Sequence, residues 1–455
     1  MERRLPVWLF LLCFLLWAIF TVFFGWVVRS KIEGGLSEKA FGDTFVTVAG
    51  FPTKAKYVLR EIYGFASGNY KDEQIRVLRD PTADYTGFTP IRSAPGIDLP
   101  GLVIKADPAR MTKGWRIAIG AFGLDGDVQN AALLISPDLE VVRMWTLDEI
   151  PIGDKDPEPR YRVFPHGVDV LKDGSLVYAF DGGMSLQRQD ACGHRMWAVR
   201  GHYNHTVNLD DTQETVWTLG DLVTLTQVSV KDGSVVREIT MDEIIEKNPM
   251  IDILEVRKLH GNYLGDNERN TSGKWMEEPH HLNDVDPLPA AYADKFKDLG
   301  FEAGDLLISS RSLNLIFVVD PDTLKIKWWR VGVTQRQHDP DWLADGTIMA
   351  FNNRMSRDFS EVLDIDPRTF KTKVLFDGSK HDFYSRIRGK IEMLDNGTLV
   401  VTSPQQARAF EVDANGDTVF EMANLKPGSD TLNYTLSEMK WFPMDYFKED
   451  TWKCE

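Results

Sequence analysis

The sequence lacks the features of several common protein classes. It has no excess of positive charge, because 52 Lys and Arg residues stand against 68 Asp and Glu residues, for a net charge of −16. Such a chain offers nothing that replaces the counterions of a phosphate backbone, so nucleic acid is not an expected partner. It also has no close cluster of His, Cys and carboxylate residues of the kind that binds zinc. We therefore expect no metal and no cofactor.

The chain also lacks a signal-peptidase site after its first apolar segment. Residues 5–28 form an uncharged run, long enough to cross a bilayer as a helix. The run ends in Trp26-Val27-Val28, which is not a small-x-small cleavage site, so we expect an uncleaved anchor over residues 1–30. Basic residues flank both ends and leave the orientation open. We expect the rest of the chain on the periplasmic or extracellular side.

Only three cysteines are present, and Cys13 lies in the apolar run. Cys192 and Cys454 could form a disulfide in an exported domain, or they could be two unrelated thiols. The sequence leaves both alternatives open.

Downstream of the anchor, residues 31–114 predict a short α-containing stalk or cap segment. Its residues 36–63 favour one or two helices, interrupted at Gly50 and Pro52. From residue 115 to 445 the pattern changes to short apolar strands separated by Asp-Gly and Asn-Gly turns, and residues 446–455 form a tail.

These strands repeat as a unit of two hairpins. One hairpin recurs as VDVLKDGSLVYAF at 168–180, PDWLADGTIMAF at 340–351 and KIEMLDNGTLVVTS at 390–403. A second hairpin follows each copy, and units recur every 40 to 75 residues or so, which is typical of propeller blades. We predict an all-β, six-bladed β-propeller, with blades starting near residues 116, 166, 205, 281, 338 and 388. An antiparallel sandwich is the alternative, but sandwiches do not repeat one unit so regularly.

Four of the nine histidines keep step with this repeat. His166 and His338 each lie seven residues before a turn aspartate, His205 lies six before one, and His281 begins a further blade. Innermost strands line the channel of a propeller, so equivalent positions in successive blades face one another. Arginines lie near the same mouth at Arg311, Arg354 and Arg388. Arginine suits an anion such as sulfate better than a metal cation.

At this point the chain resembles a known family. His281-Leu282-Asn283-Asp284, Ser309-Ser310-Arg311, Trp328-Trp329-Arg330-Val331-Gly332, Gln337-His338 and Phe351-Asn352-Asn353 occur in the order of similar motifs in the bacterial periplasmic arylsulfate sulfotransferases. The resemblance covers roughly residues 115 to 425 and is most specific over 280–354.

The resemblance implies ping-pong transfer of a sulfuryl group from an aryl sulfate, not a nucleotide sulfate, to a phenol. His338 would be the transiently sulfated nucleophile, and Arg311 and His281 would hold the sulfuryl oxygens. His205 would assist proton transfer, with His166 as second choice, and Asn283, Arg354 and Arg388 would contact substrate. Two other hypotheses are a non-catalytic propeller that binds an anionic glycan or a protein, and a metal-dependent propeller hydrolase or lyase. Neither the natural substrates nor the oligomeric state can be predicted from these residues.

Overall fold

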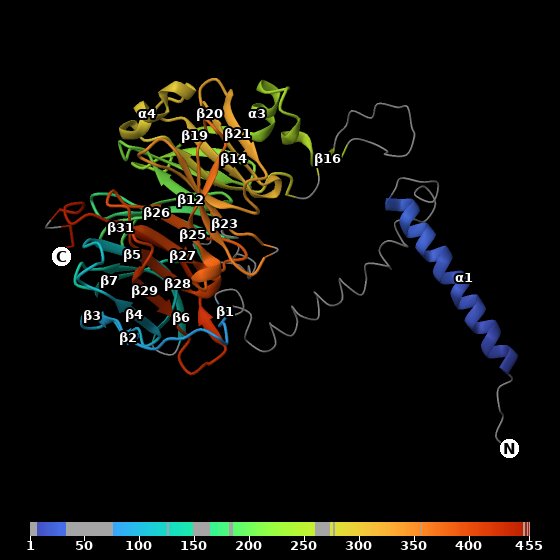
Figure 1. The fold of residues 1–455 in the computed structure, drawn as a ribbon, viewed down its shortest axis with the longest axis horizontal. Coiled ribbons are helices and arrows are strands. Elements are labelled where there is room, and N and C mark those ends of the chain that lie inside the picture. The colour runs from blue at the N-terminus through green and yellow to red at the C-terminus, as the bar shows by residue number, and fades with distance from the viewer. Residues whose placement is uncertain are drawn as a thin grey trace, which may run out of the picture. The chain divides into compact units, whose positions relative to one another are not determined.

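The structure, a computed structural model, describes residues 7–32, 76–124, 127–148, 164–181, 185–259, 274–275, 278–355, 357–448, 451–452 and 454. The chain divides into two compact units. One comprises Met1–Tyr70 and Lys258–Glu277, and the other comprises Lys71–Arg257 and Glu278–Glu455. The second unit is a six-bladed β-propeller, as the sequence predicted (Figure 1). The helices expected within residues 36–63 lie outside the described residues.

The first unit contains one long helix, α1 (Val7–Ile32). Its 26 residues give a length of about 39 Å at 1.5 Å per residue, which exceeds the thickness of a bilayer's hydrocarbon core. The run is rich in Leu, Phe and Trp and has no acidic residue in its first turn. Its length and composition suit a membrane anchor or a signal sequence.

Four blades are four-stranded antiparallel sheets, each formed by strands that follow one another in the sequence. The strands of each blade are given from the innermost to the outermost. Blade 2 contains β8 (Phe164–Val170), β9 (Leu176–Asp181), β10 (Ser185–Gln189) and β11 (Arg195–Arg200). Blade 3 contains β12 (Tyr203–Leu209), β13 (Thr215–Gly220), β14 (Thr224–Ser229) and β15 (Val235–Thr240). Blade 4 contains β18 (Leu282–Pro287), β19 (Leu306–Ser310), β20 (Leu315–Val319) and β21 (Ile326–Val331). Blade 5 contains β22 (His338–Trp342), β23 (Ile348–Asn352), β24 (Glu361–Ile365) and β25 (Thr372–Asp377).

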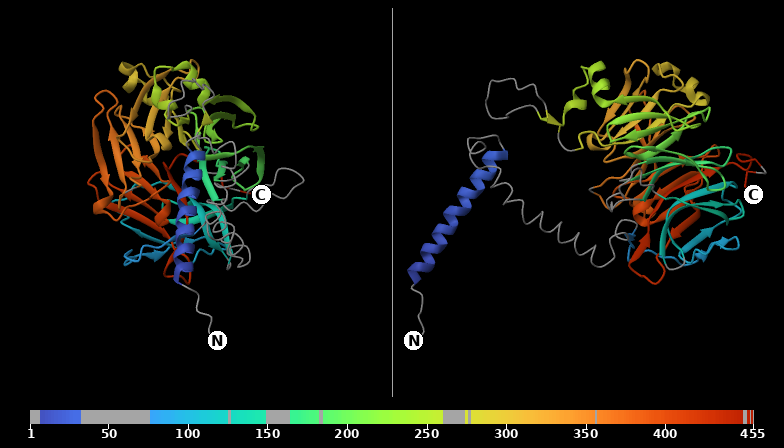
Figure 2. Two further views of the ribbon diagram at one scale, coloured as in Figure 1. Left: turned by 90° about the vertical axis from the view of Figure 1, so that its right-hand side faces the viewer. Right: turned by 180° about the vertical axis from the view of Figure 1, so that it is seen from behind.

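The other two blades combine segments from both ends of the propeller sequence. Blade 6 contains β26 (Lys390–Met393), β27 (Leu399–Ser403), β28 (Arg408–Val412) and β29 (Thr418–Asn424), followed outward by β4 (Leu102–Ala106) and β2 (Thr89–Pro90). Blade 1 has β31 (Leu436–Phe442) as its innermost strand, then β5 (Trp115–Leu124), β6 (Asp127–Ile135), β7 (Glu140–Thr146) and β3 (Arg92–Ser93). The blade expected to start near residue 116 therefore takes its innermost strand from the C-terminal part of the chain. This exchange closes the ring, which the left view of Figure 2 shows nearly along its axis.

Strands β1 to β4 lie within residues 31–114, where the sequence predicted a helical stalk. β1 (Arg76–Leu78) pairs with β30 (Leu432–Tyr434), and the other three extend blades 1 and 6. Strands β1, β2 and β3 have only two or three residues each, too few for a pattern of alternating apolar residues to reveal them.

Short helices and turns occupy the connections between blades and strands. They are α3 (Met241–Lys247), η2 (Asp252–Glu255), α4 (Ala290–Phe296), η3 (Lys297–Leu299), η4 (Arg311–Leu313), η5 (Gly378–Lys380) and η6 (Pro404–Gln406). A two-stranded ribbon of β16 (Lys258–Leu259) and β17 (Lys274–Trp275) belongs to the first unit. Residues 288–303 lengthen the first hairpin of blade 4, and α4 and η3 lie within this insertion.

The hydrophobic core is divided among the six interfaces between neighbouring blades. In β19, Leu306 and Ile308 pack toward blade 3, whereas Leu307 packs toward blade 5. Alternate residues of a strand point to opposite faces, so a blade covered on both sides needs a continuous apolar run. This requirement explains sequences such as LIFVV in β20, in which all five residues are buried.

The first hairpins of blades 2 and 5 turn as the sequence predicted. Gly174 and Gly346 have φ angles of +79° and +92°, and the preceding aspartates accept hydrogen bonds from the backbone two residues on. Glycine adopts this left-handed backbone without steric cost.

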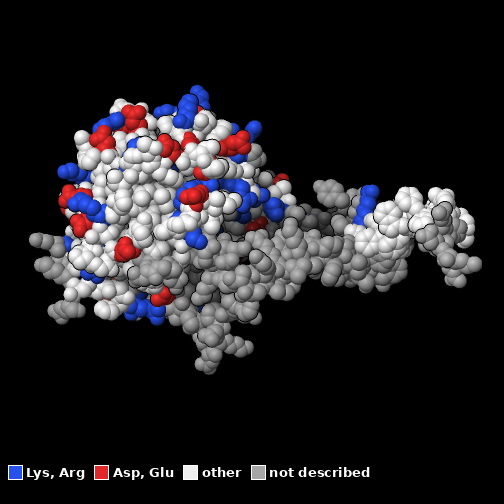
Figure 3. Space-filling view, turned by 90° about the horizontal axis from the view of Figure 1, so that it is seen from below, with Lys and Arg blue, Asp and Glu red and all other residues white. Residues whose placement is uncertain are grey.

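Cys192 and Cys454 form a disulfide across 262 residues of sequence. Cys192 lies in the turn between β10 and β11, so the bond ties the C-terminal tail to blade 2 just beyond the closing strand β31. Basic and acidic side chains are interspersed on the face that Figure 3 shows, with one gathering of basic atoms near its middle. Such a mixed surface favours solubility.

Candidate active site

The innermost strands of four blades are irregular where their histidines lie. Pairing with the second strand shifts register between Pro165 and Val168, between Asn204 and Val207, between Leu282 and Asp284, and between His338 and Asp341. Positive φ angles occur at Gly167, His205, His281 and Asp339. A β-bulge inserts an extra residue and redirects the side chains beside it. The same irregularity in successive blades brings the four histidines together at one mouth of the channel, which we call the histidine end.

Contacts between the rings define this cluster. The ring centroids of His166 and His205 lie 4.5 Å apart, and those of His205 and His281 lie 5.2 Å apart. All four histidine residues, including His338, are buried, with at most 6% of each residue exposed. Three of the predicted histidines therefore line up from blade 2 to blade 4, and His338 follows on blade 5.

His338 is held on both ring nitrogens. Its Nδ1 lies 2.7 Å from Oδ1 of Asn353, and its Nε2 accepts a hydrogen bond of 3.1 Å from the backbone N–H of Arg388. The Asn353 amide donates in turn to the carbonyl oxygens of Ser385 and Arg388, which fixes its Oδ1 as the acceptor. The ring therefore carries its proton on Nδ1 and its lone pair on Nε2.

The side chains of Gln337 and Asn283 fix the backbone beside His338. Gln337 donates from Nε2 to Ser309 and to two carbonyl oxygens of blade 4, and Asn283 donates to the Gln337 carbonyl oxygen at 2.7 Å. Asn283, predicted as a substrate contact, thus joins blade 4 to the residue before His338. Its Oδ1 is buried and has no partner among the described residues.

Arg311 lies beside His281 on blade 4. Its Nη2 is 3.2 Å from His281 Nδ1 and 3.7 Å from a carboxylate oxygen of Glu278, and its backbone N–H donates to the His281 carbonyl oxygen. Glu278 Oε2 lies 2.7 Å from His281 Nδ1. His281 Nε2 is buried without a partner among the described residues.

The two remaining predicted arginines differ in position. The Arg388 guanidinium lies over the Phe164 ring, 3.8 Å from its centroid, and 3.6 Å from Asp181, so it belongs to the histidine end. Arg354 instead forms an ion pair with Glu361 and stacks on Phe359 within blade 5. Sequence position alone could not distinguish them, because each lies two residues from a strand, Arg354 after β23 and Arg388 before β26.

Burial keeps the imidazoles of this cluster neutral. It lowers the pKa of His338 to about 3, and burial together with the charge of Arg311 lowers the pKa of His281 to about 4. The pKa values of His166 and His205 are also well below the ordinary value, first because of burial and then because of Arg388 and His166, respectively. Neutral imidazoles can act as nucleophiles or bases near pH 7.

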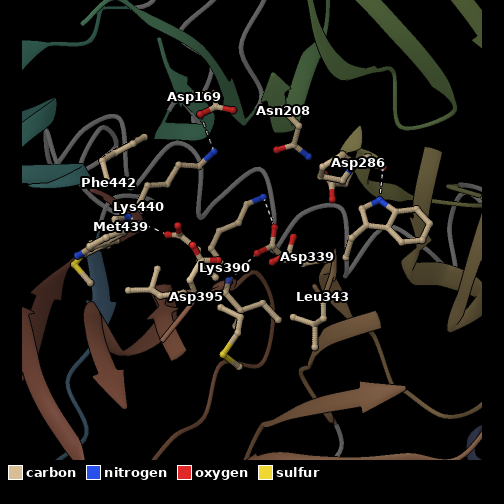
Figure 4. A pocket seen from close by; sticks show the side chains of 18 of the residues that line it. Asp169, Asn208, Asp286, Asp339, Leu343, Lys390, Asp395, Met439, Lys440 and Phe442 are labelled. Carbon is tan, nitrogen blue, oxygen red and sulfur yellow. Dashed lines mark hydrogen bonds and ion pairs between the residues drawn. The ribbon is translucent and has the colours of Figure 1, made fainter. Parts of the chain in front are cut away.

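The opposite part of the channel has a different lining, which we call the carboxylate end. A cavity of about 630 Å³ is lined there by Asp169, Asp286, Asp341, Glu392, Lys390 and Lys440, among others. Asp169 and Asp341 lie three residues beyond His166 and His338 on the same strands, on the order of 10 Å along the channel. Figure 4 shows Lys390 and Lys440 extended toward Asp339 and Asp169.

Within the described residues, no group of three or more His, Cys, Asp or Glu side chains is arranged to hold a metal ion. Sequence reasoning missed the acceptors on the imidazoles, Glu278 and Asn204, and gave no role to Asn353. Glu278 lies three residues before His281 in the sequence, but spacing alone does not show that the chain turns back between them, with positive φ at both residues.

Neutral imidazoles beside an arginine suit an anionic substrate. The profile of the arylsulfotransferase (ASST) family matches residues 167–425, more than half of the chain, and the chain belongs to that family. Membership indicates a transferase that acts in sulfuryl transfer, with small-molecule aryl sulfates and phenols as substrates. No curated protein matches the chain in sequence.

Several solved structures are weakly similar to the chain. They include a protein of unknown function from Bacteroides caccae (12% identity, TM-score 0.44, 72% of this chain and 98% of that chain), a virginiamycin B lyase from Staphylococcus aureus (10%, 0.35, 62% and 84%) and a hydrazine synthase from Kuenenia stuttgartiensis (11%, 0.36, 59% and 68%). At TM-scores below 0.5, these likenesses carry no information about the function of this chain.

Proposed function

We propose that this protein transfers a sulfuryl group from an aryl sulfate to a phenol through a covalent intermediate on His338. The observation that supports this most directly is the hydrogen-bonded state of His338. Asn353 accepts a hydrogen bond from Nδ1–H, burial lowers the ring pKa to about 3, and Nε2 is therefore unprotonated near neutral pH. A neutral imidazole with a fixed tautomer is a competent nucleophile.

In the first half-reaction, the Nε2 lone pair attacks sulfur and the bond between sulfur and the aryl oxygen breaks. The electron pair of that bond leaves on the phenolate. Since the N–H of Arg388 donates to Nε2 at 3.1 Å, this hydrogen bond must break before attack, and the same N–H can then donate to a sulfuryl oxygen. Arg311 stabilises the negative charge on the other oxygens, as fixed cations do in phosphoryl transfer.

In the second half-reaction, the oxygen of the acceptor phenol attacks sulfur, the N–S bond breaks, and its electron pair returns to Nε2. The proton of the acceptor phenol passes to a base. The sequence favoured His205 for proton transfer, then His166, and both rings lie within the cluster.

A burst experiment tests this proposal. Rapid mixing with a chromogenic aryl sulfate, without an acceptor, should release one equivalent of phenolate and leave a sulfuryl group on the peptide that contains His338. The variant His338→Ala should show no burst. His194→Gln is the matched control, because His194 is a surface imidazole with 79% of its side chain exposed, and it should retain the full burst. A burst in His338→Ala would refute the assignment of the nucleophile. Binding of sulfated glycans by a protein with no burst would favour the non-catalytic alternative.

We also propose that α1 anchors the propeller on the periplasmic or extracellular side. The disulfide between Cys192 and Cys454 supports this, because such bonds persist in oxidising compartments. Protection of the propeller from protease added to the cytosolic face of membrane vesicles would agree with it, and digestion from that face would contradict it.

A further inference from the structure

The four imidazoles of the histidine end differ in what accepts the proton of Nδ1. The acceptor for His338 is the amide oxygen of Asn353 at 2.7 Å, and that for His205 is the amide oxygen of Asn204 at 2.8 Å. The acceptor for His281 is the carboxylate of Glu278 at 2.7 Å. The Nδ1 atom of His166 is buried without a partner among the described residues. Among the described contacts of this cluster, His281 is therefore the histidine whose Nδ1 contacts a carboxylate.

The tautomer of His281 follows from these contacts. The Arg311 guanidinium, 3.2 Å from His281 Nδ1, has donors and no acceptor, so Nδ1 cannot donate to it. The carboxylate is closer and accepts, which places the proton on Nδ1 and the lone pair on Nε2. A neutral ring in this state has no N–H to offer a sulfuryl oxygen from Nε2. His281 is thus a poor ligand for those oxygens, the role that the sequence suggested. Its Nε2 lone pair can instead accept a proton, and Glu278 opposes the lowering of its pKa by burial and Arg311.

An amide and a carboxylate suit different roles. A base becomes an imidazolium, and a carboxylate on Nδ1 stabilises that cation and holds the ring in place, as the aspartate of a catalytic triad does. A sulfated nucleophile must release its sulfuryl group again. The neutral amide on His338 leaves the sulfated ring cationic and therefore a good leaving group, whereas a carboxylate would withdraw the Nδ1 proton and strengthen the N–S bond.

We propose that Glu278 is a positioning residue that makes His281 the base for the acceptor phenol, an assignment that rests on the function proposed above. As the phenol oxygen bonds to sulfur and the N–S bond breaks, the phenol proton moves to Nε2 of His281, while Nδ1–H remains on Glu278. Nε2 then releases this proton to solvent, from which the phenolate that left in the donor half-reaction takes up a proton. The proton is conserved over the cycle and no further reactant is needed.

Glu278 also lies 3.7 Å from Arg311, which offers another way for it to affect activity. If Glu278 acted mainly through Arg311, its removal would alter binding of the sulfuryl group and would change the donor half-reaction. If it acts through His281, its removal affects proton transfer from the acceptor. The two half-reactions can be measured separately, so these mechanisms give different results.

The experiment compares Glu278→Gln with the wild-type enzyme and with His194→Gln, which removes a surface imidazole that also contacts a carboxylate, that of Asp190. The donor burst is followed by rapid mixing, and steady-state turnover is measured with acceptor phenols of graded acidity. In Glu278→Gln the burst rate and the donor KM should be unchanged. Turnover with weakly acidic phenols should fall about 100-fold, and turnover with nitro-substituted phenols that are already ionised should be unchanged. The control variant should match wild type throughout.

A slower burst or a raised donor KM in Glu278→Gln would overturn the proposal in favour of an action through Arg311. An equal loss with every phenol would overturn it in favour of a structural role. Absence of a burst in the wild-type enzyme would refute the covalent mechanism itself, a result distinct from either of these.

Discussion

The histidine end and the carboxylate end of the channel are built from the same innermost strands, yet their side chains are satisfied in different ways. At the carboxylate end Lys390 Nζ lies 2.5 Å from Asp339, whose other oxygen accepts from the backbone of Ile391. At the histidine end several buried polar atoms have no partner among the described residues, including His166 Nδ1, His281 Nε2 and Arg311 Nε.

This difference indicates that one end of the channel stabilises the fold and the other end binds a ligand. Buried polar groups in proteins are normally hydrogen-bonded, and exceptions often mark sites where a ligand supplies the missing partner. The ion pair of Lys390 with Asp339 ties blade 5 to blade 6 and needs no ligand to explain it. Four predictions could break this comparison.

The substitution Lys390→Met should destabilise the fold strongly. Burial lowers the pKa of Lys390, but Asp339 and other carboxylates raise it more, so the ammonium is charged and the pair with Asp339 is intact. Removing one partner of a buried ion pair leaves an uncompensated charge and costs about 3–5 kcal/mol. Urea denaturation measures the loss.

The double variant Lys390→Met/Asp339→Asn serves as the control and should recover part of that stability, since the unpaired charge is gone. The single variant, assayed below its unfolding temperature, should still show the donor burst. A stable Lys390→Met protein without a burst would mean that the carboxylate end takes part in chemistry, and the comparison would fail.

The substitution Arg311→Ala, at the histidine end, should lower the rate of the donor burst and leave the stability of the fold nearly unchanged. Loss of a preorganised group that stabilises transition-state charge lowers the rate about 10²–10³-fold. The burst rate constant should fall by this amount while the free energy of unfolding changes little, because Arg311 is partly exposed. Arg311→Lys keeps the charge but loses the planar fork, so it should recover only part of the rate. Unfolding of Arg311→Ala comparable to that of Lys390→Met would show that this arginine is structural.

The sequence could predict that the histidines meet at the channel, because the hairpin turns show where each blade repeat begins. His166 and His338 precede their turn aspartates by the same number of residues, and equivalent positions in blades must meet at the channel. The closing strand β31 could not be assigned to blade 1, since its partner β5 lies more than 300 residues away in the chain. The choice between Arg388 and Arg354 also depends on tertiary contacts, with Phe164 in one case and Glu361 in the other. Glu278 escaped notice because its approach to His281 depends on left-handed backbone angles, which are rare outside glycine.

The smallest expected effect is that of acid on the donor burst. The folded-state pKa of His338 is lowered to about 3, so its neutral form predominates at every pH above that value and is lost only as the pH falls through it. The burst rate constant, measured by acid-quenched single turnover, should therefore be nearly constant from pH 8 to pH 5. An imidazole with an ordinary pKa of about 6.5 would lose about thirtyfold over the same range.

Stability should respond to pH at the carboxylate end instead. Burial raises the pKa of Asp284 from 3.8 to about 7, so the folded protein binds a proton there that the unfolded chain has already lost. Its contribution to stability is present below the unfolded pKa and disappears as the pH rises through about 7. Asp284→Asn should reduce the decline in stability between pH 5 and pH 8 without changing the burst. If the burst rate instead followed the titration of Asp284, the two ends of the channel would be coupled in catalysis, and the histidine end could not be treated as a separate site.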